Sequence, residues 1–300
     1  MISVVIPLYN KERSIVSTIE SVLSQTNKDW ELIIVDDGST DNSLNIVKEF
    51  IERIDNRWIS DRFTIISQPN TGVSAARNAG IMAANSEYVA FLDADDLWAP
   101  NYLETLAILI QDYPNAGLYS LGSIYIYTDT IPQNLAMKET AYKGVIASPW
   151  DGNYQRLMTS SSSSSRDRLI KVGLFDTRMS YGEDLDMWWR LILDGGLAVD
   201  TTCCAFYRLN TENRAMNKPI PLKKHIPYYM DKYSEARAKN ANFRRYFDMQ
   251  MVYRLYPYMF DKQYRKDARR IAKKLDYRQL KVTMLLRLLF PHLYRLFTGR

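Results

Sequence analysis

Two carboxylates, Asp93 and Asp95, stand two residues apart directly after the apolar run Tyr88–Leu92. Carboxylate oxygens are the ligands that Mg²⁺ and Mn²⁺ prefer, and these cations keep open positions for substrate phosphates. Two such side chains can face one point where a strand breaks into a turn, so the pair is a candidate metal site. A solvated turn in which Asp96 caps the following helix explains the same residues equally well, because acidic turns are common.

Two further polar positions each allow two interpretations. Segment 36–39 (Asp-Asp-Gly-Ser) follows the apolar run Glu31–Val35, and its carboxylates suit either an Asx turn or a nucleoside contact. Arg77 opens an alanine-rich segment with a helical pattern. There it could bind a phosphate at the helix N-terminus or form a surface salt bridge.

A third acidic pair, Glu183 and Asp184, follows Gly182 and precedes a helical pattern that contains Trp188 and Trp189. A carboxylate at the mouth of a cleft can act as a general base. Acidic residues at a helix start also complement the helix dipole, and for an isolated pair this second interpretation is the better one.

These polar clusters lie within an alternation of strand-like and helix-like segments. The alternation predicts an α/β fold, with a mostly parallel sheet and helices on both faces. Ligands bind such sheets beyond the carboxyl ends of the strands, which is where the clusters stand. Strands are predicted at 3–8, 31–35, 63–66 and 88–92, and helices at 15–23, 44–51, 73–84 and 100–110.

The middle of the chain is less regular. Six consecutive serines, Ser160–Ser165, suit a strand at the edge of a sheet better than a linker, because the pattern of a packed helix follows at once. A helix through Trp188 and Trp189 is predicted to end at Gly195. We also predict strands at 117–127, 198–200 and 205–207, and a loop at 131–150.

Five segments give these weak signals a common meaning: Val5–Asn10, Val35–Asp41, Asn70–Gly80, Phe91–Asp96 and Gly182–Asp186, in this order. Together they closely resemble family 2 glycosyltransferases with the GT-A fold. The resemblance covers about residues 1–210, and Lys171–Asp176 is also similar to that family.

The resemblance implies how a nucleotide-sugar donor, most simply a UDP-sugar, is bound. It places Pro7, Tyr9, Asp37 and Arg77 around the nucleotide, with Asp37 facing the base. The leaving group is a nucleoside diphosphate, and its growing negative charge calls for a divalent cation and a cationic side chain.

The resemblance also implies the catalytic residues. Asp93 and Asp95 match the DXD motif, in which Asp95 is the main contact to a Mn²⁺ or Mg²⁺ ion on the diphosphate. Asp184 matches the general base that takes a proton from the acceptor hydroxyl, which is otherwise a poor nucleophile. The implied reaction is a single displacement that inverts the anomeric carbon.

One position departs from the family. Many relatives carry a histidine shortly after a Tyr-Arg pair, where this chain has Asn210 after Tyr207 and Arg208. Either Asn210 replaces the histidine as an oxygen ligand, or Arg208 neutralises the diphosphate.

Charge divides the chain into two parts. Residues 1–217 hold 18 basic and 28 acidic residues, a net charge of −10, whereas residues 218–300 hold 21 and 6, a net charge of +15. We therefore predict a catalytic domain at 1–217 and a basic, tyrosine-rich helical extension at 218–300. The asymmetry suggests an anionic partner for the extension.

Other counts exclude several classes of protein. A composition of 46% hydrophobic and 24% charged residues is that of a globular chain, not of a disordered or collagen-like one. The histidines, His225 and His292, both lie in the basic part, which excludes a Ser-His-Asp triad in the acidic part. Adjacent Cys203 and Cys204 indicate reduced thiols. With no secretory signal and no apolar run of about 18 residues, we predict a cytoplasmic protein.

The basic extension contains an amphipathic helical pattern at 264–275, with a cationic side opposite an apolar stripe. It could bind anionic lipid, where each Lys or Arg contributes about 1 kcal/mol. It could also pack on the acidic part, bind a partner enzyme or bind nucleic acid. We favour an anionic membrane surface on the inner face of the cytoplasmic membrane over nucleic acid, with Leu285–Phe297 dipping into the lipid without spanning it.

The sequence thus predicts an inverting, metal-dependent glycosyltransferase of bacterial surface-polysaccharide biosynthesis, acting on a glycan or lipid-linked acceptor. A sugar-nucleotide nucleotidyltransferase is one alternative, but segment 8–11 lacks the glycine-rich loop of that class. A catalytically silent sugar-binding module is the other, and it is disfavoured because every expected carboxylate is present.

Overall fold

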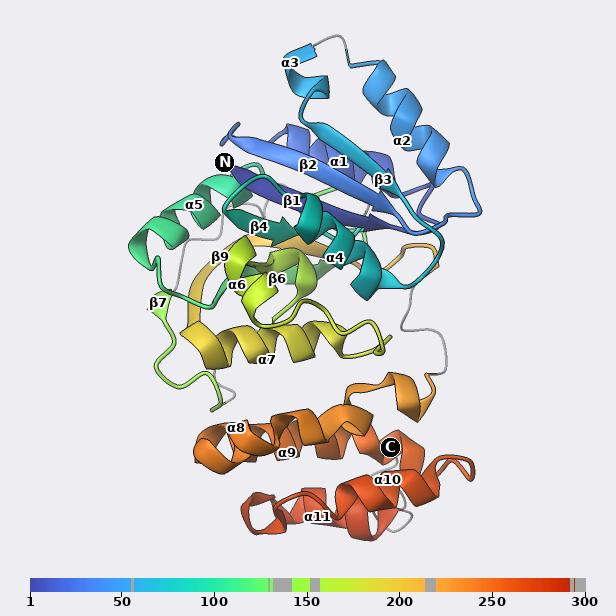
Figure 1. The fold of residues 1–300 in the computed structure, drawn as a ribbon, viewed down its shortest axis with the longest axis vertical. Coiled ribbons are helices and arrows are strands. Elements are labelled where there is room, and N and C mark those ends of the chain that lie inside the picture. The colour runs from blue at the N-terminus through green and yellow to red at the C-terminus, as the bar shows by residue number, and fades with distance from the viewer. Residues whose placement is uncertain are drawn as a thin grey trace. The chain divides into compact units, whose positions relative to one another are not determined.

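The computed structural model describes residues 1–54, 57–128, 130–131, 142–151, 157–213, 220–291 and 294 (Figure 1). The chain divides into two compact units. The first unit comprises residues 1–147 and 155–218, and the second comprises 148–154 and 219–300. The sequence suggested a division after residue 217 but gave no sign that 148–154 groups with the C-terminal residues.

The first unit is built on one sheet in the order β3-β2-β1-β4-β8-β6-β9-β5, with β7 beside β9. Its first four strands are parallel, as predicted, with β1 and β2 buried and β3 at the edge, and the register sets Val5 of β1 beside Ile33 of β2 and Phe91 of β4. The other half is mixed, because β8, β5 and β7 run antiparallel to their neighbours. The strands are β1 (Ile2–Leu8), β2 (Trp30–Asp36), β3 (Phe63–Ser67), β4 (Tyr88–Phe91), β5 (Leu97–Trp98), β6 (Leu118–Ile126), β7 (Lys143–Val145), β8 (Ser162–Ser165) and β9 (Leu197–Arg208).

Helices cover both faces of this sheet, because alternate side chains of a buried strand point to opposite sides. Val4 and Ile6 belong to a core with α1 (Ile15–Leu23), α2 (Ser43–Glu52) and α5 (Tyr102–Asp112). Val5 instead faces α4 (Val73–Ala83), which packs so closely that a Cβ at Gly80 would lie 2.4 Å from Val5 Cγ1. The unit also contains α3 (Arg57–Ser60), α6 (Arg166–Lys171) and α7 (Glu183–Gly195).

The serine run lies inside the sheet. After a 3₁₀ turn at Thr159–Ser161, β8 pairs with β4 on one side and β6 on the other. The predicted strand is confirmed, but its place at a sheet edge is wrong. Hydroxyls tolerate this burial where they find local acceptors: Ser162 Oγ donates to Met158 O (2.7 Å) and Ser164 Oγ to Gly117 O (2.6 Å).

Three other predictions are refined. The two short strands expected at 198–200 and 205–207 are one strand, β9, which pairs with β6 through register shifts around Gly122. The helix through Trp188 ends as expected, with Gly196 at φ 78° as its C-cap. The loop expected at 131–150 falls partly outside the described residues, and within it Lys143–Val145 forms β7. Cys203 and Cys204 are buried free thiols.

The second unit is helical, as predicted. Its helices are α8 (Ser234–Lys239), α9 (Ala241–Leu255), α10 (Arg265–Ala272) and α11 (Val282–Leu289), with 3₁₀ turns at Leu222–Lys224, Ile226–Tyr233, Tyr256–Met259 and Tyr277–Gln279 (Figure 1). Phe243 and Phe247 of α9 are fully buried in its core, and the Trp150 ring lies 4.7 Å from that of Phe243. In the described part of the chain, no helix has the length and apolar character needed to cross a membrane.

Candidate functional site

The predicted residues of the first unit gather at the carboxyl ends of β1, β2 and β4. In parallel strands these ends share one edge of the sheet, and the register sets Leu8 of β1 beside Asp36 of β2. The chain leaves β1 through Asn10, whose φ of 53° is left-handed and whose Oδ1 accepts the Thr40 amide (2.8 Å). The loops after β1 and β2 are thereby tied together.

Asp37 is buried and organises the loop before α4. Its Oδ1 accepts the Thr71 amide (2.9 Å) and Gln68 Nε2 (2.8 Å), and its Oδ2 accepts the Gly72 amide (2.8 Å). Gly72, at φ 99°, is the N-cap of α4, so Asp37 fixes the start of the helix that carries Arg77. Pro7 is buried within β1, and Tyr9 is half-buried directly after it. The nucleotide contacts assigned to these residues stay predictions.

Arg77 is not the exposed salt bridge that its residue type allowed. Its guanidinium, 4% exposed, donates to Asp93 Oδ1 (2.9 Å) and to Glu183 Oε1 (3.1 Å), and it lies 5.3 Å from the centre of the Phe175 ring. These carboxylates raise the pKa of Arg77 further, although burial opposes them. Burial also raises the pKa of Glu183 to about 7, helped by the neighbouring Asp184 charge and opposed by Arg77.

Asp184 follows Glu183 in α7 and so lies at the cluster formed by Arg77, Asp93 and Glu183. It stands in the first turn of the helix, is half-buried, and accepts the Leu185 amide through Oδ1 (2.7 Å). Its charge acts on both Arg77 and Glu183. The fold therefore brings Asp93 and Glu183, 90 positions apart in the chain, to one buried guanidinium, and Asp184 is the next residue after Glu183.

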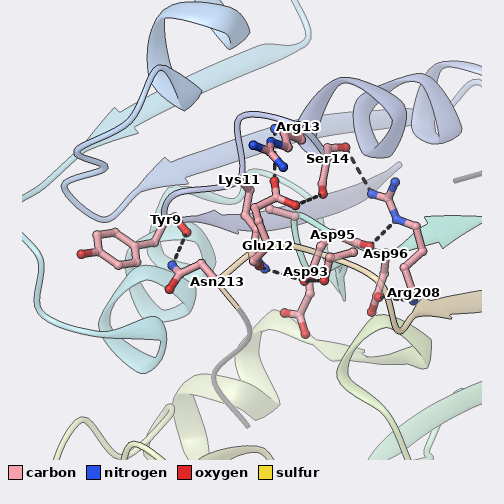
Figure 2. A network of polar contacts seen from close by, with 12 residues as sticks. Tyr9, Lys11, Arg13, Ser14, Asp93, Asp95, Asp96, Arg208, Glu212 and Asn213 are labelled. Carbon is pink, nitrogen blue, oxygen red and sulfur yellow. Dashed lines mark hydrogen bonds and ion pairs between the residues drawn. The ribbon is translucent and has the colours of Figure 1, made fainter. Parts of the chain in front are cut away.

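Asp95 faces the segment that follows β9 (Figure 2). Its Oδ2 accepts Lys11 Nζ (2.6 Å) and Thr211 Oγ1 (2.8 Å). Lys11 Nζ also donates to the Glu212 carbonyl, and Glu212 Oε2 accepts Ser14 Oγ (2.7 Å). Sequence analysis did not identify Lys11, Thr211 or Glu212 as site residues, because nothing in their local patterns signals partners that lie 84 to 201 positions away in the chain.

Asp96 does not cap the following helix. Its buried carboxylate accepts Ser160 Oγ and the Arg208 amide (3.2 Å), while Ser160 Oγ accepts the Asp93 amide (3.1 Å). Burial raises the pKa of Asp96 well above its usual range, and the charges of Asp95 and Asp93 add to the effect. Ser160, from the serine run, thus positions the Asp93–Asp96 turn.

Arg208 is buried and makes several hydrogen bonds within the first unit. Its side chain is 3% exposed and donates to the Asp95 carbonyl, to Ser17 Oγ (2.8 Å), to Ser14 O (3.2 Å) and to Thr18 Oγ1 (3.1 Å). A guanidinium held in this way ties α1 to the Asp95 turn (Figure 2), and the diphosphate contact suggested for Arg208 stays a prediction. The Asn210 amide donates to Tyr127 O (3.3 Å), away from Asp95.

The residues at Asp93 and Asp95 suit a divalent cation in part. Within the described residues, Asp93 Oδ2 and Asp95 Oδ1 accept no hydrogen bond, and both side chains are partly exposed, at 27% and 19%. Two hard oxygens thus remain for Mg²⁺ or Mn²⁺, with further ligands from a diphosphate. The described residues contain no group of three or more His, Cys, Asp or Glu side chains placed to hold a metal.

Comparison with proteins of known structure finds a similar fold. The structure of S. aureus TarS (residues 1–349) in complex with UDP-GlcNAc matches 96% of this chain and 78% of that chain, with a TM-score of 0.61 at 17% identity. The complex of the same protein with UDP matches with a TM-score of 0.58 at 18% identity. The likeness supports the predicted GT-A type of fold.

Sequence comparison finds glycosyltransferases. An Escherichia coli UDP-Glc:alpha-D-GlcNAc-diphosphoundecaprenol beta-1,3-glucosyltransferase, WfgD, is 26% identical over 75% of this chain and 83% of its own length. Streptococcus pneumoniae glycosyltransferase GlyG is 34% identical over 62% of each chain. Two further relatives are matched over only 35% and 17% of their length. The family model described as Glycosyl transferase family 2 matches residues 3–160, more than half of the sequence, and the chain belongs to this family.

Proposed function

We propose that the protein is an inverting glycosyltransferase that moves a sugar from a UDP-sugar to a hydroxyl of a glycan or lipid-linked acceptor in bacterial surface-polysaccharide synthesis. Family membership supports the class, the UDP-GlcNAc bound to TarS supports the donor, and the lipid-linked acceptor in the name of WfgD supports the acceptor type. The observation that carries the proposal is the convergence of Asp93 and Glu183 on Arg77, because it sets Asp184, the residue after Glu183, at the same cluster as the Asp93–Asp95 turn.

Asp184 takes the proton in the proposed reaction. The acceptor oxygen forms a bond to the anomeric carbon while the bond from that carbon to the diphosphate oxygen breaks, and Asp184 removes the hydroxyl proton as the new bond forms. Glu183 is unsuited to this task, because it is buried against Arg77. Glu183 and Arg77 instead hold the start of α7 against the Asp93 turn, which fixes the position of Asp184.

Asp93 and Asp95 would hold a Mn²⁺ or Mg²⁺ ion through the oxygens that accept no hydrogen bond among the described residues. The ion, when bound, neutralises charge that develops on the leaving diphosphate. Arg77 supports metal binding by keeping the Asp93 carboxylate oriented through its hydrogen bond to Oδ1. Asp37 contributes by fixing the loop that carries the N-terminus of α4.

The proposal is tested by measuring release of UDP and transfer of sugar after a thermal-shift screen of nucleotide sugars. Asp184→Asn should keep the thermal shift with the donor but lose transfer by about 10²–10⁴-fold, as expected for a general base. Asp194→Asn, at the other end of the same helix, is the matched control and should retain transfer. Unchanged turnover in Asp184→Asn contradicts the assignment. Donor binding without any transfer supports the sugar-binding module, and formation of sugar nucleotides supports the nucleotidyltransferase.

We further propose that the second unit binds an anionic membrane surface. The apolar stripe of α10 is packed within the unit, since Ala268, Ile271 and Ala272 are buried. Helix α11 instead exposes Val282 (71%), Leu286 (37%), Leu289 (55%) and Phe290 (56%). Of the predicted dipping segment, Leu288 is buried and residues 292, 293 and 295–297 lie outside the described residues.

An apolar helix face within a part of net charge +15 is suited to a bilayer with anionic headgroups. The test is cosedimentation of the full chain with vesicles that contain or lack phosphatidylglycerol. The triple variant Val282→Ser, Leu286→Ser, Leu289→Ser should lose binding, whereas Met82→Ser with Ile108→Ser, two exposed apolar positions of the first unit, should not. Equal vesicle binding by both variants contradicts the proposal. Binding to nucleic acid instead of vesicles favours a nucleic-acid partner for the second unit. A location on the cytoplasmic face stays a prediction.

A further inference from the structure

Lys11 is a lysine in an unusual environment. The residue is 9% exposed, and its ammonium lies 2.6 Å from Asp95 Oδ2. A charged group loses hydration when it is buried, and a partner of opposite charge with a further hydrogen bond offsets that loss. Asp95 provides the charge and the Glu212 carbonyl provides the further acceptor. Lys11 therefore occupies the position of a built-in counter-ion to Asp95.

The two carboxylates of the site are neutralised by different means. Asp93 is held by Arg77, whose rigid, buried guanidinium is fixed by Glu183 as well. Asp95 is held by an ammonium on a flexible stem, which can turn away from the carboxylate and keep its bond to the Glu212 carbonyl. Only the second arrangement allows one cation to be exchanged for another.

Residues 211–213, here called the strap, depend on the same ion pair. Thr211 Oγ1 and Lys11 share Asp95 Oδ2, and Lys11 links that oxygen to the Glu212 carbonyl. The far side of the strap is held separately, because Glu212 Oε1 accepts the Arg13 amide (3.1 Å) and Oε2 accepts Ser14 Oγ (Figure 2). Removing Lys11 from Asp95 thus leaves Thr211 as the one remaining link of the strap to Asp95 among these contacts, which loosens that side, while Glu212 stays bonded to Arg13 and Ser14.

We propose that Lys11 is the counter-ion of Asp95 in the metal-free protein, and that a divalent cation binds Asp95 by displacing the Lys11 ammonium, which loosens the strap. The inference rests on the proposed function for the metal, but the exchange itself follows from the Lys11–Asp95 contact. Two cations repel at such distances, so the ammonium and the metal compete for one carboxylate.

The first experiment measures Mn²⁺ binding to the full chain without nucleotide, by electron paramagnetic resonance of the free ion. Lys11→Met should bind Mn²⁺ about tenfold more tightly than the wild type, because the competing charge is gone. Lys11→Arg should bind no more tightly than the wild type. Lys28→Met, at an exposed lysine of the same unit, should leave binding unchanged, and Asp95→Asn should abolish it. Equal or weaker binding by Lys11→Met overturns the inference.

The second experiment needs no variant. Hydrogen exchange of the amides at 209–213 should accelerate on addition of Mn²⁺, whereas the amides of β1 and β2 should not change. Unchanged protection of the strap overturns the proposed loosening. If neither the wild type nor Lys11→Met binds Mn²⁺, the displacement of Lys11 by a metal is refuted. Sugar transfer that persists in EDTA would then remove the metal from the proposed function and leave the glycosyltransferase assignment standing.

Discussion

The first unit buries Arg77 between Asp93 and Glu183, whereas the second unit exposes Lys266, Arg269 and Lys273 along α10. Both units contain many charged residues, and residues 1–217 and 218–300 differ in net charge by sign, −10 against +15. The charges of the two units nevertheless have different roles. Buried charges are fixed by partners from distant segments, while exposed charges act through their sum.

This difference shows which charges can position reacting groups and which can only attract a partner of opposite charge. A carboxylate held by a buried guanidinium has a defined direction, which catalysis and metal binding require. A cationic helix surface has no fixed partner and is suited to a diffuse anionic surface. Among its described residues, the second unit also has a buried ion pair of the first kind, Arg237 with Asp248 (2.8 Å), which holds α8 to α9.

The largest expected effect comes from replacing Arg77, the buried charge of the first unit. Arg77→Met leaves Asp93 and Glu183 without their shared partner, so we expect the free energy of unfolding to fall by about 3–5 kcal/mol. Urea denaturation followed by tryptophan fluorescence measures this loss. The control is Arg270→Met, since the Arg270 side chain is 65% exposed and pairs with the neighbouring Asp267, and its urea midpoint should not move. Similar shifts for both variants mean that burial does not separate the two kinds of charge.

A second prediction concerns the boundary of the units. Trp150 is 8% exposed and packs on Phe243 and Tyr246 of α9, so Trp150→Ala should destabilise the second unit by about 3 kcal/mol. Hydrogen exchange of α9 should accelerate, whereas exchange of β1 and β2 should stay unchanged. Tyr142→Ala, at a 44% exposed ring before β7, should affect neither. Faster exchange in β1 would show that residues 148–154 belong to the first unit.

The smallest effects concern pH, and they have opposite signs in the two units. Burial raises the pKa of Glu183 from 4.5 to about 7, so the folded first unit binds a proton that the unfolded chain releases. Its contribution to stability is complete below pH 4.5 and is lost as pH rises to about 7. Burial, with a contribution from Arg254, lowers the pKa of His225 from 6.5 to about 3, so the second unit loses stability as pH falls below 6.5.

Within these windows, each group changes the free energy of unfolding by at most about 1.4 kcal/mol for one pH unit. Glu183→Gln should therefore flatten the fall in stability of the first unit between pH 4.5 and 7. His225→Phe should remove the acid sensitivity of the second unit between pH 6.5 and 3. Unfolding followed separately in each unit by hydrogen exchange measures both slopes. If a variant shows the same dependence of stability on pH as the wild type, burial of that residue is not the cause of the dependence.

Much of the fold follows from local sequence. The apolar runs of β1, β2, β3 and β4 and the helical spacing between them predicted the parallel half of the sheet. The other half was harder to predict, because β8 is made of serines, whose hydroxyls carry no apolar signal. Whether Ser162 lies at an edge or between two strands depends on β4 and β6, which are distant in the chain.

The candidate site, like the fold, was predicted from the sequence only in part. Sequence alone determined the residue types available at the strand ends: Asp37, Asp93, Asp95 and Asp184 follow from motif and order. Only the tertiary structure decided their partners, because a guanidinium or an ammonium can reach any carboxylate that folding brings near. Arg208, expected at a diphosphate, holds α1 to the Asp95 turn, and Lys11, unremarked in the sequence, holds Asp95 itself. The reason is physical: a buried charge must find its counter-charge within a few ångströms in space, whatever their separation in sequence.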